Sequence, residues 1–173
     1  VVNPLKVVLT NYTEGVSGTR SAGFHPNHPE FGEREVGLSR EIWIERDDFS
    51  DTPPPGWQRL TLGGEARLRY SYVVKCDEVI RDVAGEVTEL RCSIDHETLG
   101  KNPVGRKVKG VIHYVAADTA LPIEVRLYDR LFTVPRPDAT KDEAGHEIDF
   151  KSYLNRASLT VVASASCGLP ESR

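Results

Sequence analysis

Residues that could read unpaired nucleobases are concentrated between Trp57 and Lys75. Recognition of single-stranded RNA needs cations for the phosphates, planar donors for the base edges and flat rings for stacking. A guanidinium group can contact a base edge at two points or lie flat over a base, and the amide of Gln58 can both donate and accept. The arginines of this stretch are Arg59, Arg67 and Arg69. Two interpretations stay open: a base-reading surface, or a solvated strand face.

A second group of cations is the basic segment Arg106-Lys107-Val108-Lys109-Gly110. It lacks the G-x-x-x-x-G-K-[ST] pattern of a phosphate-binding P-loop. It could contact an RNA backbone and so position the RNA, or it could be a structural linker whose charges face water. For the first interpretation, Arg106 and Lys107 are the candidate RNA-binding residues.

No pattern in the chain indicates catalysis or metal binding. We find no nucleophile with an accompanying base signature. His25 and His28 are three residues apart, but Pro26 lies between them and no further ligand is nearby, so a proline-rigid loop is favoured over a metal site. We therefore expect no catalytic, cofactor-binding or metal-binding residues in this chain.

Composition and charge indicate a folded protein with an uneven surface. The 173 residues are 39% hydrophobic and 28% charged, which is enough for one modest core or two small ones. A net charge of −4 argues against a uniformly basic nucleic-acid binder. However, Lys and Arg outnumber the acids from 101 to 136, and acids dominate from 137 to 150. A basic band beside an acidic loop is expected.

The cysteines and the start of the chain indicate where the protein is expected to act and whether it is a fragment. Cys76, Cys92 and Cys167 are odd in number and widely spaced, which favours reduced cytoplasmic thiols. No segment predicts a membrane span or a signal peptide, so no membrane is expected as a partner. The sequence also indicates no obligate protein partner. The chain opens without Met, and we expect it to be a fragment of a longer protein.

The elements that must position these residues are short strands. Alternation from 67 to 75 places Leu68, Tyr70, Tyr72 and Val74 on one face of a continuous strand, with Arg67 and Arg69 on the other. Further β-type runs cover 5–12, 36–46, 111–115, 123–128 and 159–165, and 79–92 has the pattern of a hairpin. No stretch shows a sustained helical stripe. The fold class is therefore mainly β, with one or two small barrels.

Two segments carry a resemblance to a known family. Arg-Lys-Val-Lys-Gly-Val-Ile-His-Tyr, beginning at Arg106, and Leu-Pro-Ile-Glu-Val-Arg-Leu-Tyr-Asp-Arg-Leu-Phe, ending at Phe132, resemble the C-terminal anticodon-binding region of the bacterial-type, class I glutaminyl-tRNA synthetases. The resemblance implies two L25-like β-barrels, a proximal one over residues 1–110 and part of a distal one over 111–173.

The resemblance also implies roles for individual residues. Arg59 matches the family's arginine that reads the third anticodon base, and Arg67 and Arg69 lie in the segment that encloses the first base. Gln58 stands where a Lys is often found. The residues that read the middle base lie outside this sequence, so the anticodon pocket is expected to be incomplete.

The implied function is recognition of tRNA(Gln) for a glutamine–tRNA ligase, the fragment itself being non-catalytic. Glutamine and ATP, with Mg, are the substrates and cofactor implied for the parent enzyme. Two alternatives stay open: a stand-alone L25-like ribosomal RNA-binding barrel, and the equivalent domain of a glutamyl-tRNA synthetase.

Overall fold

The computed structural model describes residues 1–13, 20–142 and 144–168, without the side chains of 20 and 164–168. The chain divides into two compact units. The first comprises Val1–Ile123 and the chain from Ala165 onward, and the second comprises Glu124–Ser164. The domain boundary near residue 110 stays a prediction.

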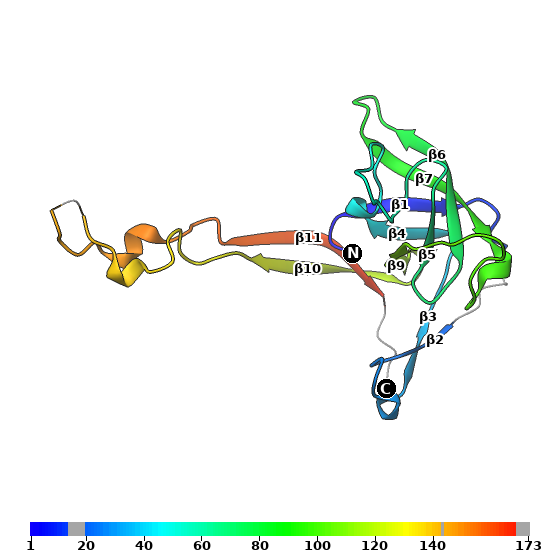
Figure 1. The fold of residues 1–173 in the computed structure, drawn as a ribbon, viewed down its shortest axis with the longest axis horizontal. Coiled ribbons are helices and arrows are strands. Elements are labelled where there is room, and N and C mark those ends of the chain that lie inside the picture. Colours follow the sequence, from blue (N-terminus) through cyan, green and yellow to red (C-terminus); the bar gives the residue numbers. More distant parts are fainter. Residues whose placement is uncertain (14–19, 143, 169–173) are drawn as a thin grey trace. The chain divides into compact units, whose positions relative to one another are not determined.

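A seven-stranded sheet forms the first unit, in the order β8-β5-β6-β7-β1-β4-β9. Neighbouring strands are antiparallel except for the parallel pairs β1/β7 and β5/β8. The strands are β1 (Pro4–Leu9), β4 (Glu41–Glu45), β5 (Glu65–Leu68), β6 (Val73–Arg81), β7 (Val87–Asp95), β8 (Val111–Ile112) and β9 (Tyr114–Ala116). Figure 1 shows β1, β4, β5, β6, β7 and β9 lying close together. The prediction of a mainly β protein with a barrel is confirmed.

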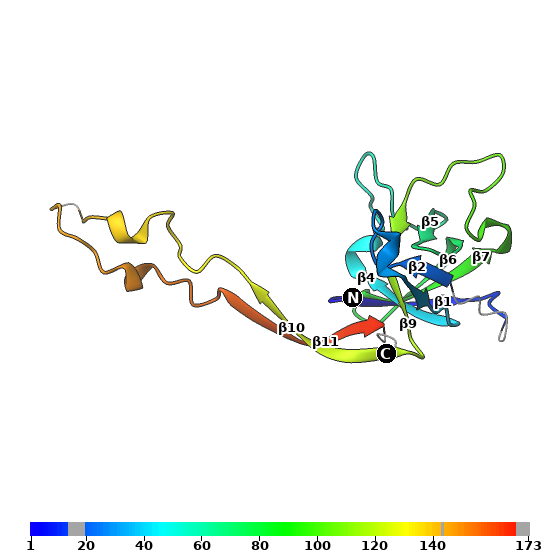
Figure 2. The same cartoon turned by 90° about the horizontal axis from the view of Figure 1, so that it is seen from below.

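The sheet is nearly closed because its two edge strands are consecutive in the chain. β8 is one edge and β9 is the other, and only His113 separates them. The segment from Val111 to Ala116 can pair with both β5 and β4 only if the sheet curls until its edges approach each other. Figure 2 shows this curled arrangement from a second direction. Closure shields the edge strands, whose backbone groups would otherwise be open to other chains.

The core of the first unit follows the alternation of its strands. Leu5, Val7 and Leu9 of β1 are buried, and their neighbours Lys6 and Val8 are not. The same period of two continues in the flanking strands, as a sheet with one face on a core requires. The remaining large core side chains include Ile42, Ile44, Leu60, Leu68, Val74, Leu90, Ile94, Ile112 and Tyr114.

The predicted continuous strand from 67 to 75 is wrong, because the chain reverses within it. β5 ends at Leu68 and β6 begins at Val73, and the two strands pair antiparallel. The amide of Ser71 donates to the carbonyl of Leu68 at 2.8 Å and closes the turn. Tyr70 lies in this turn with a positive φ of 63°, and the residue is 46% exposed. The turn could not be predicted from the sequence, because the apolar alternation continues through it and it contains no Gly, Pro or Asn, the residues that usually indicate a turn.

The hairpin predicted for 79–92 is present, as strands β6 and β7 joined by a turn. Cys76 of β6 lies directly opposite Cys92 of β7, and both are buried, free thiols. The side chain of Cys167 lies outside the described residues. A second hairpin pairs β2 (Arg20–Gly23) with β3 (Glu33–Val36).

The second unit consists of paired strand segments and short helical turns. β10 (Ala120–Tyr128) pairs with β11 (Leu159–Gly168) in a two-stranded sheet, and both strands continue into the first unit. Its backbone bonds include Asp129 to Ser158 at 2.7 Å and Thr133 to Tyr153 at 2.9 Å. The helical turns of the described chain are of the 3-10 type: η1 (Pro29–Phe31), η2 (Arg46–Asp48), η3 (His96–Thr98), η4 (Pro137–Ala139) and η5 (Phe150–Tyr153). None of the described helices is long and apolar enough to cross a membrane.

Candidate nucleic-acid interface

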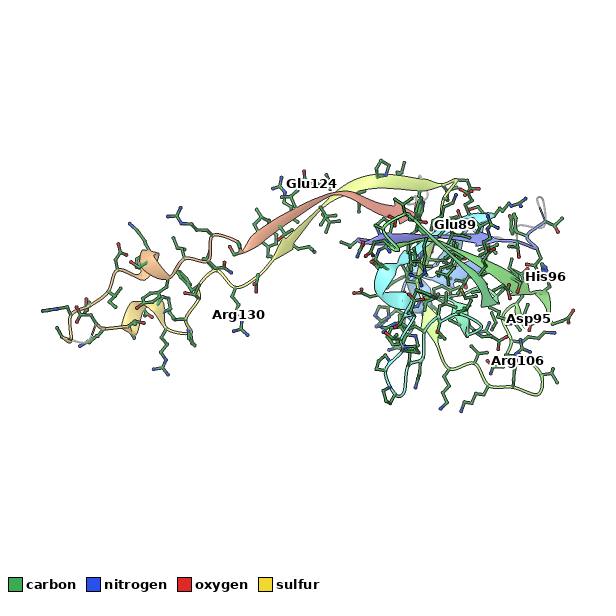
Figure 3. All side chains as sticks on the ribbon, turned by 90° about the horizontal axis from the view of Figure 1, so that it is seen from above. Glu89, Asp95, His96, Arg106, Glu124 and Arg130 are labelled. Atoms are coloured by element: carbon green, nitrogen blue, oxygen red, sulfur yellow. The ribbon has the colours of Figure 1, made fainter. Side chains whose placement is uncertain are left out.

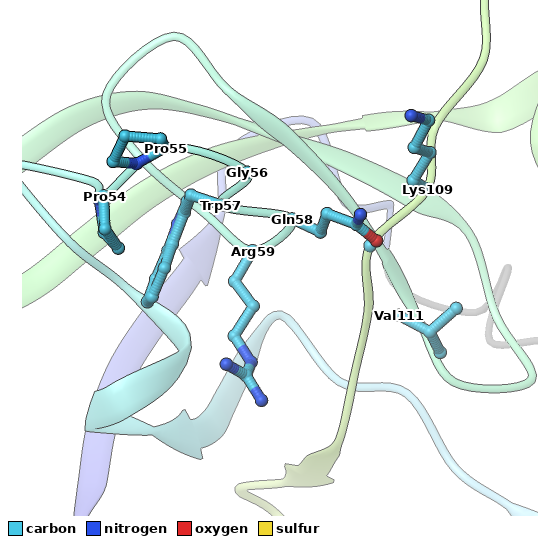
Figure 4. A pocket seen from close by; sticks show the side chains of 9 residues that line it. Pro54, Pro55, Gly56, Trp57, Gln58, Arg59, Lys109 and Val111 are labelled. Carbon is cyan, nitrogen blue, oxygen red and sulfur yellow. The ribbon is translucent and has the colours of Figure 1, made fainter.

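Two segments far apart in sequence form the walls of an open groove in the first unit. One wall is the proline-rich loop that leads to Trp57, Gln58 and Arg59, and the other is the basic segment from Lys107 to Gly110. The groove consists of two adjoining hollows of about 390 and 510 Å³ that share most of their lining. Figure 4 shows Trp57, Gln58 and Lys109 around one of them. The groove thus combines a ring, an amide and cations, which recognition of single-stranded RNA requires.

Gly110 allows these walls to approach each other. A Cβ at this position would lie 1.7 Å from the carbonyl oxygen of Gln58 and 2.8 Å from its carbonyl carbon. The carbonyl of Gly110 also accepts from the amide of Arg67 at 2.8 Å, which joins the segment to β5. Only a glycine allows the backbone at position 110 to lie this close to the backbone of Gln58.

Arg59 is held in a fixed place within the groove. Its Nε lies 2.7 Å from Oδ1 of Asp48, and its guanidinium carbon lies 5.7 Å from the centroid of the Trp57 ring. The Trp57 ring is itself fixed, since its Nε1 donates to the carbonyl of Leu60 at 3.0 Å. The side chain of Arg59 remains 53% exposed, whereas that of Asp48 is 12% exposed. Arg59 is therefore oriented from one side and open to a ligand from the other.

Burial affects the carboxylate that orients Arg59. Desolvation raises the pKa of the Asp48 carboxyl above its ordinary value, and the positive charge of Arg59 opposes this shift. An ion pair with one buried and one exposed partner is stronger than a fully exposed one, because water screens it less. Asp48 lies in η2 (Arg46–Asp48), directly after β4.

The predicted RNA-binding cations of the basic segment, Arg106 and Lys107, differ in their ion pairs, because only Arg106 binds carboxylates of the described residues. Nε and a terminal nitrogen of Arg106 bond the two oxygens of Glu65 at 2.9 and 3.0 Å, and the guanidinium also bonds Asp95. Figure 3 shows Arg106 beside Asp95. The hydrogen bond from Arg106 lowers the pKa of Asp95, and the two carboxylates raise the pKa of Arg106. Arg106 therefore anchors its loop to β5 and β7.

The neighbouring lysines face solvent. Lys107 and Lys109 are exposed and line the groove, and neither forms an ion pair with the described residues. Their charges are available for phosphate groups. Lys109, like Trp57, was not among the candidate residues of the sequence. The sequence feature that could have identified Trp57 as a site residue is its position directly after the Pro53-Pro54-Pro55-Gly56 break.

Arg67 and Arg69 lie apart from the lining of this groove. The guanidinium of Arg67 donates to the carbonyls of Ser71, Thr98 and Lys101 at 3.0, 2.9 and 2.6 Å. Arg69 is exposed in the turn after β5, with its guanidinium carbon 6.0 Å from the centroid of the Tyr70 ring. The structure thus brings Gln58, Arg59 and Lys107 together in the groove, whereas Arg67 lines a separate, third hollow.

Comparison with known proteins gives the family of this chain. A family model described as "tRNA synthetases class I (E and Q), anti-codon binding domain" matches residues 1–95, and a second model of the same description matches residues 111–171. This chain belongs to the anticodon-binding domains of the class I tRNA synthetases for glutamate and glutamine. The resemblance read from the two sequence segments is confirmed.

Individual relatives of this anticodon-binding domain are glutamine–tRNA ligases. The ligase of Chromobacterium violaceum is 64% identical over 178 aligned positions, which cover 100% of this chain and 32% of the ligase. The ligase of Neisseria meningitidis is 59% identical over 95% of the chain and 29% of its own length. That of Pseudomonas putida is 52% identical over 94% of the chain and 28% of its own length. The anticodon-binding domain therefore spans about a third of these relatives. The comparisons do not favour the ribosomal barrel or the glutamyl enzyme.

Candidate metal ligands are not assembled in the described part of the anticodon-binding domain. No group of three His, Cys, Asp or Glu side chains is placed to hold an ion there. His25 and His28 instead pack edge to face at 4.6 Å, and the His28 ring stacks on Phe31 at 5.1 Å. Nδ1 of His28 also lies 2.8 Å from Glu30. These contacts order the loop between β2 and β3.

Proposed function

We propose that this chain recognises the anticodon loop of tRNA(Gln) as part of a glutamine–tRNA ligase. The observation that carries the proposal is the groove in which Arg59, oriented by Asp48 and Trp57, faces solvent opposite Lys107 and Lys109. The similarity to glutamine–tRNA ligases over the full length of the chain supports it.

In this proposal, each part of the groove has a separate task. Lys107 and Lys109 bind phosphate groups and set the position of the RNA, which carries no sequence information by itself. Arg59 and Gln58 read base edges through forked or paired hydrogen bonds, worth about 1–3 kcal/mol of discrimination per good bidentate pair. Arg106 contributes by holding its loop against Glu65 and Asp95.

The remaining steps of a ligase belong to its catalytic part. Activation of glutamine with ATP and Mg²⁺ and its transfer to the tRNA are proposed for that part, and no residue of this chain is assigned to them. The chain would then act in the cytoplasm, where tRNA is charged. Binding at the anticodon favours the correct tRNA for the reaction.

Anticodon variants test the proposal directly. Binding of tRNA(Gln) and of a variant with a changed third anticodon base is measured for the unchanged chain and for Arg59→Ala at one salt concentration. We expect Arg59→Ala to weaken binding of the correct tRNA by about 1–3 kcal/mol and to reduce the preference over the variant. Equal weakening for both RNAs contradicts base reading by Arg59.

Arg91→Ala is the matched control for this experiment. The Arg91 side chain is 48% exposed and pairs with Glu78 and Glu89, so it resembles Arg59 in exposure and in ion pairing. It belongs to β7 and is not part of the groove lining. We expect Arg91→Ala to leave both affinity and anticodon preference unchanged.

A further inference from the structure

Tyr70 adopts a backbone conformation that a tyrosine normally avoids. Among the residues that the structure describes, it alone combines a side chain with a positive φ, at 63°. It is the third residue of the turn that the amide of Ser71 closes on the carbonyl of Leu68. Positive φ at this position usually calls for Gly or Asn, because a bulky side chain is strained there. A tyrosine at this point needs a compensating reason.

Packing in the core does not supply that reason. Tyr70 is 46% exposed, whereas Leu68 and Tyr72, two residues away on each side, are 0% and 7% exposed. The turn directs the Tyr70 ring to solvent and leaves its neighbours in the core. The guanidinium carbon of Arg69 lies 6.0 Å from the ring centroid and places a cation beside the exposed ring.

Tyr70 lines a hollow that shares no lining residue with the groove of Arg59. The hollow measures about 370 Å³, and its lining includes Tyr70, Arg67, Lys101 and Asn102. It therefore offers a flat ring, hydrogen-bond donors and a cation within one concave site. This is the combination of groups that an unstacked nucleobase needs.

Arg67 fixes the walls of this hollow. Its guanidinium donates to the carbonyl of Ser71 in the turn and to those of Thr98 and Lys101 in the segment after β7. Thr98 is itself fully buried, and its hydroxyl accepts from the amide of Val73 at 2.8 Å. Both sides of the hollow are thereby held before any ligand arrives, which lowers the entropic cost of binding.

We propose that the Tyr70 ring is a stacking platform for an unpaired base of the tRNA anticodon loop, with Arg67 as a positioning residue that holds the hollow open. The inference rests on the proposed function and adds to it a residue that stacks on a base. Stacking on a ring tolerates any base, so Tyr70 supplies affinity, whereas Arg59 supplies discrimination.

Two substitutions distinguish the effect of the Tyr70 ring from the effect of the strained backbone. Asn adopts positive φ more readily than Tyr and lacks a ring, so Tyr70→Asn relieves strain while it removes the platform. Tyr70→Phe keeps the ring and is the matched control. The probe is an RNA hairpin with the anticodon stem and loop of tRNA(Gln), and the measurements are its dissociation constant and the thermal unfolding midpoint of the protein.

We expect Tyr70→Asn to raise the unfolding midpoint and to weaken RNA binding about 5- to 100-fold, the range for loss of one stacked base. Tyr70→Phe should bind within about twofold of the unchanged chain, because stacking needs the ring and not the hydroxyl. With 2-aminopurine at successive loop positions, one position should lose its fluorescence quenching in Tyr70→Asn alone.

The outcomes distinguish this inference from the proposed function. If the unchanged chain binds the hairpin and Tyr70→Asn binds it equally well, the stacking role is wrong and the proposed function stands. If Tyr70→Asn loses binding together with stability, Tyr70 is a structural residue and the inference is again wrong. If the unchanged chain does not bind the hairpin, both fail.

Discussion

The carbonyl oxygen of Gln58 occupies the space that a side chain on Gly110 would need, since a Cβ there would lie 1.7 Å from it. The two residues are distant in sequence, yet their backbones are in direct contact and hold the two walls of the groove together. The groove therefore depends on the absence of a side chain at position 110.

Gly110→Ala should separate the two walls. The clash is with backbone atoms, which cannot rotate away as a side chain can, so we expect a loss of about 1–3 kcal/mol of stability and weaker binding of tRNA(Gln). Chemical denaturation and RNA binding measure the two effects. Gly37→Ala is the control, because no atom lies within 4 Å of a Cβ at Gly37 and its φ is not positive. Equal effects of both substitutions would show that the contact with Gln58 is unimportant.

Asp48 should give the stability of the protein a distinct pH dependence. Burial raises the pKa of this carboxyl in the folded state above its ordinary value of 3.8. Between 3.8 and the raised pKa, the folded state holds the proton more tightly than the unfolded state, so stability falls as the pH rises through this interval and is level above it. The Asn side chain of Asp48→Asn does not titrate, so the stability of this variant lacks the pH dependence that Asp48 contributes.

The measurement for Asp48 is the difference in unfolding free energy between the unchanged chain and Asp48→Asn as a function of pH. Taking the difference removes the contribution of the other carboxylates. We expect it to decline from pH 3.8 upward and then to remain constant. A difference that is level above pH 3.8 and falls as the pH drops below 3.8 would mean that the ion pair with Arg59, and not burial, dominates the pKa of Asp48.

Lys107→Ala should reduce the salt dependence of RNA binding. A lysine that neutralises one phosphate of single-stranded RNA contributes about 0.7 to the slope of log affinity against log salt concentration. Arg106→Ala should change this slope less, because Glu65 and Asp95 already neutralise the Arg106 charge. Titrations at several salt concentrations give the slopes. A larger change for Arg106→Ala would assign Arg106 to the phosphates.

Arg67→Lys should destabilise the first unit although the charge is retained. An ammonium group cannot reach three carbonyls in the fork geometry with which Arg67 bonds Ser71, Thr98 and Lys101. Lost hydrogen bonds to partly buried carbonyls cost about 1–3 kcal/mol. Denaturation of the variant checks this value. Unchanged stability together with weaker RNA binding would instead favour direct contact of Arg67 with RNA.

Local pattern was sufficient to predict much of this protein. Alternating apolar residues in β1 and in the β6–β7 hairpin predicted strands, because a sheet with one buried face imposes a period of two on its own sequence. The family resemblance came from contiguous segments between Arg106 and Phe132. The site candidates Gln58, Arg59 and Lys107 were chosen by residue type, and they line one groove.

Only the tertiary structure shows which partners these residues have. The turn at Tyr70 interrupts an unbroken alternation, because pairing of β5 with β6 overrides the local pattern. Arg67 and Arg106 read as free cations in sequence, but their hydrogen-bond partners come from other elements of the fold. The contact of Gly110 with Gln58 is likewise long-range. Sequence therefore determined most of the strands and the family, whereas contacts between distant segments decided where the chain turns at Tyr70, which arginines face solvent and which stabilise the fold.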